Sequence, residues 1–140
     1  MQSSDLDAVL ALEQAAYLFP WSRGSFDDCL QANYSAWVVQ ISSQLVAYGL
    51  FFVAADEANI LNVCVDPEYQ QRGLGQRLLR FLLAQAKAGG AQNAFLEVRQ
   101  SNQAAIALYD RVGFNQYAER KQYYPGIPDR EDAVLYCKTL

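Results

Sequence analysis

Two glycines separated by one residue, Gly73 and Gly75, stand just ahead of an apolar helical pattern and carry the clearest chemical signal in the chain. A glycine-rich turn at a helix N-terminus leaves backbone N–H groups without acceptors, at the positive end of the helix dipole. Such turns bind phosphate groups, and glycine lets an anion approach the backbone closely. Arg72 and Arg77 add positive charge. The segment therefore predicts a phosphate-containing ligand, although the same glycines would also suit a tight helix entry.

Two common nucleotide-binding motifs do not fit this turn. A Walker loop needs Gly-Lys-Ser/Thr after its first glycines, whereas Gln76 and Arg77 follow here. A dinucleotide fingerprint needs a third glycine, and Leu78 occupies that position. The ligand is therefore expected to be bound in another way.

The chain contains no histidine among its 140 residues, which excludes histidine-based triads and histidine metal ligands. A general base must then be an acidic residue, Tyr, Cys, Lys or water, and we expect no metal site. Cys29, Cys64 and Cys137 stand far apart without a Cys-x-x-Cys pair, which indicates reduced thiols and a cytoplasmic protein. Cys64 lies between two valines, so we expect a buried, inert thiol rather than a nucleophile.

The net charge of −4 and the pI of about 4.7 argue against direct nucleic-acid binding, which needs a basic face. An acidic chain suits a cationic partner such as a polyamine or a basic peptide. No apolar run approaches the ~20 residues of a membrane span, and the first residues are polar and acidic, unlike a signal peptide. We therefore expect no membrane association.

The elements that position these residues follow from hydrophobic periodicity and turn residues. Ser4 and Ser22 are expected to cap the first two helices, and residues 121–130 to form a polar loop. We predict one domain over 1–140 with helices at 5–17, 22–30, 73–87 and 102–112, and strands at 36–41, 45–53, 59–65, 94–98, 114–119 and 133–138. The order ααβββαβαββ predicts an α+β or α/β sandwich with one mixed sheet.

The segment Gln70-Gln-Arg-Gly-Leu-Gly75 resembles the acetyl-coenzyme A signature of the GNAT N-acetyltransferases. Leu96-Glu-Val-Arg99, Ser101-Asn102, Leu108-Tyr109 and Gly113-Phe114 resemble the second half of that fold. The resemblance implies a three-layer α/β/α arrangement around a mixed, mainly antiparallel sheet, with acetyl-coenzyme A as co-substrate. It also implies a set of residues that contact this co-substrate: Val63, Cys64, Val65, Gln70, Gln71, Arg72, Gly73, Leu74, Gly75, Gln76 and Asn102.

The same resemblance assigns Glu97 as general base and Tyr109 as general acid, in a direct attack within a ternary complex. A carboxylate can take the proton of an amine directly or through water, and a protonated phenol can return one to the leaving thiolate. From the residues alone, Glu97 could be a solvated strand residue and Tyr109 a core aromatic.

Phe19-Pro-Trp-Ser22, Tyr123-Tyr-Pro125 and Glu131-Asp-Ala133 resemble the RimI-type branch, which acetylates the N-terminal alanine of a small-subunit ribosomal protein. The resemblance implies a basic ribosomal-protein N-terminus as acceptor. We expect Phe19, Pro20, Trp21, Tyr123 and Tyr124 to clamp an extended peptide, since aromatic residues offer apolar area and, in tyrosine, a polar tip. Acetylation of a small amine or an aminoacyl conjugate, and a non-catalytic coenzyme A-binding module, remain as alternatives.

One departure from the family pattern concerns its first strand. Only Met1-Gln-Ser-Ser precedes Asp5, so either the start is trimmed or the sheet lacks one strand. Strand 36–41 is then an exposed edge, which would favour weak self-association.

Overall fold

The computed structural model describes residues 1–140, and its elements follow the expected order ααβββαβαββ. Two short 3-10 turns, η1 and η2, accompany the four helices and six strands. Their bounds are η1 Ser3–Asp5, α1 Leu6–Ala16, α2 Arg23–Gln31, β1 Ser35–Ile41, β2 Gln44–Ala54, β3 Glu57–Val65, η2 Pro67–Tyr69, α3 Leu74–Ala88, β4 Asn93–Arg99, α4 Gln103–Val112, β5 Asn115–Tyr124 and β6 Glu131–Thr139.

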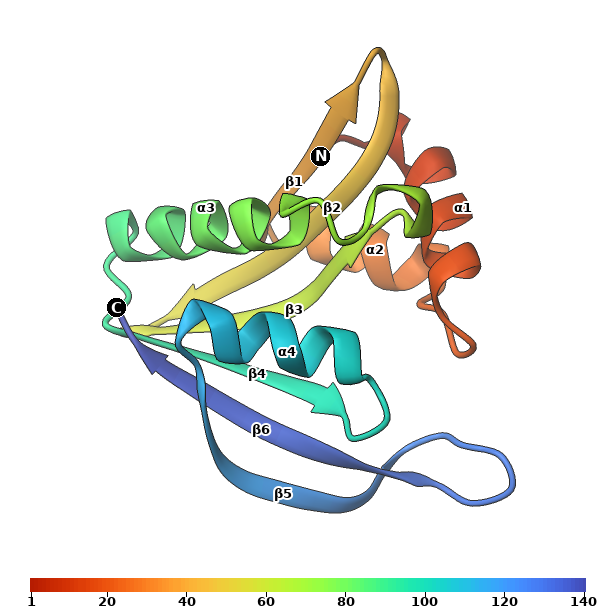
Figure 1. The fold of residues 1–140 in the computed structure, drawn as a ribbon. Coiled ribbons are helices and arrows are strands. Elements are labelled where there is room, and N and C mark those ends of the chain that lie inside the picture. The colour runs from red at the N-terminus through yellow and green to blue at the C-terminus, as the bar shows by residue number, and fades with distance from the viewer.

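The strands form one sheet in the order β1-β2-β3-β4-β6-β5, in which only β3 and β4 run parallel. Helices α1 and α2 lie on one face, and α3 and α4 lie on the other (Figure 1). The arrangement confirms the expected α+β fold with three layers and a mainly antiparallel sheet. None of the four helices combines the length and the apolar composition of a membrane span.

Two apolar clusters hold the layers together, one on each face of the sheet. The larger packs Leu78, Leu79 and Leu82 of α3 against the sheet and α4. These leucines recur at helical spacing, so they share one side of α3. The smaller cluster packs Leu6 and Val9 of α1 with Phe26 of α2 against β2 and β3. The site must therefore form where these layers leave a gap.

The gap lies between β3 and β4. The two strands pair only from Glu57–Ile60 to Asn93–Leu96, after which no ladder joins them. They diverge towards their carboxyl ends, and Figure 1 shows the resulting opening between β3 and the tip of β4. The second half of β3 thus presents one unpaired edge inside the sheet.

Two sequence-based expectations about local structure are wrong. Ser4 does not cap α1: the helix follows the 3-10 turn Ser3–Asp5, where the Gln2 backbone N–H donates to the Asp5 carboxylate at 2.7 Å. Residues 121–124 are not loop but continue β5, across an irregular register after Arg120. Tyr124 pairs with Glu131 of β6, and the Gln122 N–H donates to the side-chain carboxylate of Asp132 at 2.9 Å, so this stretch is held along the neighbouring strand.

No strand precedes α1 among residues 1–5, as expected from the sequence. The Met1 ammonium instead donates to the Ala36 carbonyl oxygen at 2.7 Å, next to the outer strand β1. Ser22 caps α2 as predicted, since its hydroxyl oxygen accepts from the Ser25 N–H.

Candidate active site

A cavity of about 810 Å³ occupies the opening between β3 and β4. Its walls come from the end of α1, β3, the turn before α3, the end of β4 and α4. Eleven of the residues expected at the site line this cavity: Phe19, Val63, Cys64, Val65, Gln70, Gln71, Gly73, Gly75, Gln76, Asn102 and Tyr109. Arg72, Leu74, Glu97, Pro20, Trp21, Tyr123 and Tyr124 are not among its lining residues.

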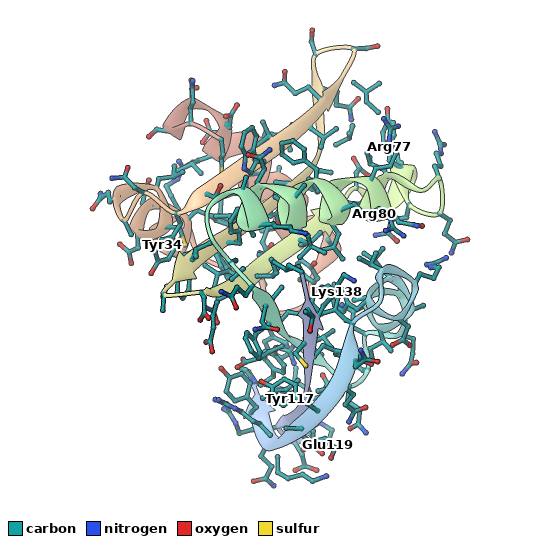
Figure 2. The ribbon with its side chains drawn as sticks, turned by 90° about the vertical axis from the view of Figure 1, so that its left-hand side faces the viewer. Tyr34, Arg77, Arg80, Tyr117, Glu119 and Lys138 are labelled. Carbon is teal, nitrogen blue, oxygen red and sulfur yellow. The ribbon has the colours of Figure 1, made fainter.

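The turn before α3 presents a row of free backbone donors. None of the N–H groups of residues 71–76 has an acceptor within the protein, and the first helical bond in this region runs from Arg77 N–H to the Gly73 oxygen. Gly73 has φ +79°, a left-handed conformation that favours glycine. Together with the α3 dipole, these donors fit the phosphate groups of a coenzyme A molecule. Arg77 and Arg80 project from the same half of α3 (Figure 2).

The unpaired edge of β3 supplies further backbone groups. The Val63 carbonyl oxygen accepts from the Tyr17 hydroxyl at 3.0 Å, and the Val65 oxygen accepts from the Gln70 amide at 3.0 Å. The Asp66 N–H points the other way and bonds Val46 of β2. Since successive residues of a strand alternate in direction, the N–H groups of Val63 and Val65 face the opening. This edge can pair with an extended amide-containing chain.

The N-terminus of α4 forms the opposite wall. Asn102 caps this helix, with its side-chain oxygen accepting from the Ala105 N–H at 3.2 Å. Leu108 of α4 also reaches α3, where a Cβ at Gly75 would lie 3.4 Å from its side chain. The small residue at 75 thus lets the two helices approach each other beside the cavity.

Cys64 is a buried cavity residue with an unreactive thiol. Only 3% of it is exposed. Burial raises the pKa of its thiol to about 12, although hydrogen bonds from Tyr48 and Tyr17 act in the opposite direction. Since the thiolate is the nucleophilic form, the thiol is inert near neutral pH. The structure agrees with the interpretation of Cys64 as a buried thiol.

Tyr109 is both a core aromatic and a residue of the cavity wall. Its ring packs against Phe114 and Tyr136 in the larger core, and its residue surface also lines the cavity. Burial raises the pKa of its hydroxyl to about 12, so the group is protonated at neutral pH. A protonated phenol of this kind can act as a proton donor.

Glu97 lies on the face of the sheet opposite to α3 and α4. Its neighbours Leu96 and Val98 point into the core beneath α3 and α4, so the Glu97 side chain points away from those helices. Its carboxylate is about one-third exposed and lies 4.0 Å from the Arg120 guanidinium. It also faces the Tyr123 hydroxyl and thereby raises the pKa of Tyr123. A group reaching Glu97 must approach from this open face.

Arg99, at the end of β4, joins the two aromatic segments. Its guanidinium donates to the Pro125 oxygen at 2.7 Å and to Glu131 at 3.1 Å. It also lies over the rings of Phe19 (5.0 Å) and Tyr124 (4.6 Å). Burial acts to raise the pKa of Glu131, but hydrogen bonds from Ser101 and Arg99 hold it below its ordinary value. Arg99 was only part of a motif in the sequence, and no local pattern indicated these contacts.

The other aromatic residues expected to hold the acceptor are less close together. Trp21 is half-buried against Phe26, with ring centroids 5.1 Å apart. The Tyr123 ring packs edge-on against Tyr124 at 4.9 Å. Phe19 and Tyr124 are therefore joined through Arg99, while Pro20, Trp21 and Tyr123 remain predictions for acceptor contact.

Glu13 was not among the residues expected at the site. It is 1% exposed and is the single acidic or basic side chain in the buried core. Its carboxylate accepts from the Tyr48 hydroxyl, the Asn62 amide (2.9 Å) and the Trp21 N–H (2.8 Å). A carboxylate among apolar residues at helical spacing in α1 was the available signal.

Comparison with known proteins agrees with this geometry. The model of the acetyltransferase (GNAT) family matches residues 6–114. The chain is 39% identical over 140 residues to the [ribosomal protein bS18]-alanine N-acetyltransferase of Escherichia coli, covering all of this chain and 95% of that protein. It is 41% identical over 138 residues to the enzyme of the same name from Haemophilus ducreyi, covering 97% and 94% of the two chains.

Solved structures give the same result. The crystal structure of the ribosomal-protein-S18-alanine N-acetyltransferase from Escherichia coli superposes with a TM-score of 0.91 at 38% identity, covering 99% of this chain and 90% of that one. Ard1 from Thermoplasma volcanium has a TM-score of 0.90 at 22% identity over 100% and 94%, which shows the shared fold. The family expected from residues 70–75 is confirmed: the chain belongs to the GNAT acetyltransferase family and is an acetyl-coenzyme A-dependent N-acetyltransferase.

Proposed function

We propose that this enzyme acetylates the N-terminal α-amine of a small-subunit ribosomal protein that begins with alanine. The observation that carries the proposal is the 39% identity across the full chain to an enzyme named for alanine acetylation of ribosomal protein bS18. A ribosomal acceptor also agrees with the acidic net charge of −4, because ribosomal proteins are mostly basic. On this proposal the enzyme works in the cytoplasm.

The co-substrate, acetyl-coenzyme A, supplies an acetyl group activated as a thioester. The free N–H groups of residues 71–76 are proposed to bind its pyrophosphate, and the open edge of β3 to pair with its pantetheine amides. The N–H of Val65 faces the opening, where it can donate to the thioester carbonyl oxygen as negative charge develops there. These contacts use backbone groups, so they depend on the path of the chain more than on the side-chain types along the turn.

Proton movement is assigned to Glu97 and Tyr109. An α-amine with a pKa of about 8 is mostly protonated at neutral pH and must lose a proton before it attacks. We assign that proton to Glu97, directly or through water, since its carboxylate lies on the open face of the sheet. Tyr109, protonated and lining the cavity from α4, is assigned to return a proton to the leaving thiolate.

The acceptor peptide is proposed to lie between residues 19–21 and residues 123–124. Arg99 holds Phe19 and Tyr124 on the same side of the opening. An extended N-terminus that enters between them would pass the side chain of Glu97 on β4 before it meets the thioester. The co-substrate and the acceptor then reach the opening from opposite faces of the sheet, which suits direct transfer in a ternary complex.

The test uses intact-mass and fragment-ion analysis after incubation with acetyl-coenzyme A and a peptide mixture. The peptides begin with Ala, Ser, Met or Gly, and controls carry a blocked N-terminus with free lysines; spermidine is included. One acetyl group on the α-amine of the Ala-starting peptide supports the proposal. Acetylation of spermidine alone would overturn the substrate and favour the small-amine alternative. Bound co-substrate without any transfer would favour a coenzyme A-binding module.

A further inference from the structure

The buried carboxylate of Glu13 has no place in the proton transfers described above. It lies in the third turn of α1 and pairs with no arginine or lysine. Burying a carboxylate without a cation is costly unless hydrogen bonds satisfy it. Three donors do so here, and they come from three different parts of the chain: β2, β3 and the segment after α1.

One of these donors belongs to the segment expected to hold the acceptor. The Trp21 N–H to Glu13 is the only hydrogen bond made by residues 18–21. Leu18 is 77% exposed, and the Arg99 guanidinium lies over the Phe19 ring. The position of this short segment therefore depends on the stacking of Phe19 on Arg99, the packing of Trp21 on Phe26, and one hydrogen bond, from Trp21 to Glu13.

The other two donors connect the same carboxylate to the strand beside the cavity. Asn62 precedes Val63 on β3, and the Tyr48 hydroxyl contacts both Glu13 and Cys64. The Trp21 ring packs on Phe26, and Phe26 packs edge-on against Tyr48 at 5.7 Å. Glu13 thus closes a ring of contacts that fixes residues 18–21 relative to the unpaired edge of β3.

We propose that Glu13 is a positioning residue for the acceptor: it sets the distance between the Phe19–Trp21 segment and β3, and so determines how tightly the acceptor peptide binds. The inference rests on the proposed function, because it takes residues 19–21 as one wall of the peptide site. A positioned loop binds its ligand without first becoming ordered. Loss of the attachment should therefore affect acceptor binding more than co-substrate binding.

The test compares Glu13→Gln with Val9→Ala. The amide of Gln is close in size to the carboxylate but places an N–H group against donors. Val9 is fully buried one turn earlier on α1 and makes no polar contact with residues 18–21. Val9→Ala should therefore lower the stability of the fold, as Glu13→Gln should, without removing a hydrogen bond to this segment. For Glu13→Gln we expect the KM of the Ala-starting peptide to rise about tenfold and the KM of acetyl-coenzyme A to stay within about twofold. For Val9→Ala we expect a lower Tm and unchanged KM values.

A second readout does not depend on the substrate. In a Trp37→Phe background, Trp21 is the single tryptophan, and Glu13→Gln should increase the quenching of its fluorescence by acrylamide, whereas Val9→Ala should not. In the unmodified protein the Trp21 amide should exchange its hydrogen at least tenfold more slowly than the amides of Leu18 and Phe19, which make no hydrogen bond.

The outcomes separate the two proposals. Equal quenching in the two variants, or fast exchange of the Trp21 amide, would overturn the positioning role even if the peptide is acetylated. Unchanged peptide KM in folded Glu13→Gln would do the same. If the unmodified enzyme acetylates no peptide while the Trp21 readouts behave as expected, the attachment stands and the proposed acceptor is wrong. The exchange measurement needs no variant, so fast exchange of the Trp21 amide would overturn the proposal even if Glu13→Gln does not fold.

Discussion

At the scale of single residues, the proposed site separates the groups assigned to proton transfer from those assigned to substrate binding. The binding groups facing the opening are largely backbone N–H groups of β3 and the turn before α3. The titratable groups assigned to chemistry lie apart from them, with Tyr109 on α4 and Glu97 on the open face of β4. Side-chain changes at these two positions should therefore alter turnover without removing the co-substrate site.

Glu97→Gln tests the assignment of the base. The amide keeps the shape of the side chain but cannot accept a proton from the amine, so kcat should fall by a factor of about 10²–10⁴ while both KM values change little. Steady-state kinetics against peptide and acetyl-coenzyme A measure this. Glu119→Gln, on the exposed strand β5 (Figure 2), is the matched control and should retain full activity. Unchanged kcat in Glu97→Gln would remove this residue from the mechanism.

The raised pKa of Cys64 gives a second prediction at this scale. Because burial raises the pKa to about 12, the thiolate is scarce at pH 8, and iodoacetamide should leave Cys64 unmodified in the folded enzyme. Half-buried Cys137 should react faster. Peptide mass analysis after timed alkylation measures both sites. Protein unfolded in urea provides the control, in which all three cysteines should react; rapid alkylation of Cys64 before unfolding would contradict the buried, inert state.

At the scale of elements, the turn before α3 depends on its left-handed Gly73. An alanine there would meet no atom within 4 Å, so the effect comes from the backbone alone. Gly73→Ala should destabilise the fold by about 1–2 kcal/mol and disturb the row of free N–H groups. We expect the Kd for coenzyme A, measured by titration calorimetry, to rise about tenfold, since anion binding depends on those donors.

Gly90→Ala is the matched control for this substitution. Gly90 also has a positive φ, of +99°, and a Cβ added there would likewise meet no atom within 4 Å. It lies after α3, at the opposite end of that helix from the turn. The control should lose similar stability and keep its affinity for coenzyme A. An equal Kd for coenzyme A in Gly73→Ala and Gly90→Ala would contradict the assignment of residues 71–76 as the phosphate-binding turn.

The hydrogen bonds that Glu131 of β6 accepts from Arg99 and Ser101 should be weakened in acid, which should lower the stability of the fold. The pKa of Glu131 is lowered by the hydrogen bonds from Ser101 and Arg99, which outweigh the effect of burial. A carboxylate with a lowered folded pKa contributes stability above its unfolded pKa of about 4, and this contribution is lost as the pH falls through the folded value. The Tm should therefore decrease between about pH 5 and pH 3, and less so in Glu131→Gln.

Calorimetry across this pH range measures the effect. Glu68→Gln, at an exposed carboxylate, is the control and should keep the acid sensitivity of the unmodified enzyme. A Tm profile of Glu131→Gln that coincides with that of the unmodified enzyme would show that Glu131 adds nothing to acid lability.

Local patterns were sufficient for most elements and insufficient for the contacts that join them. The leucines of α3 and the turn at Ser42–Ser43 have strong local signals, so both were predicted. Residues 121–124, Lys-Gln-Tyr-Tyr, show no alternation of apolar and polar side chains, and pairing with β6 makes them strand. Glu13 meets Tyr48 and Asn62 across 35 and 49 residues of sequence, which no periodicity reports. The backbone donors of the site were predicted better than its side-chain contacts for this reason.

At the scale of the whole molecule, the net charge of −4 should affect how fast the acceptor arrives. Long-range attraction between an acidic enzyme and a basic peptide is screened by salt. The value of kcat/KM for a basic Ala-starting peptide should fall severalfold between about 50 and 300 mM salt. A peptide with the same first residues and neutral residues beyond them is the control. A similar decrease for both peptides would show that steering has no part in the effect.

The short pairing of β3 with β4 has a consequence for the cohesion of the molecule. Only four residue pairs join β1–β3 to β4–β6, and beyond them each half of the sheet ends in its own open border. A ligand bound between these two strand edges would supply backbone hydrogen bonds that β3 and β4 do not make to each other. A ligand that bridges the two borders binds the folded chain alone, so saturating co-substrate should raise the Tm of the enzyme.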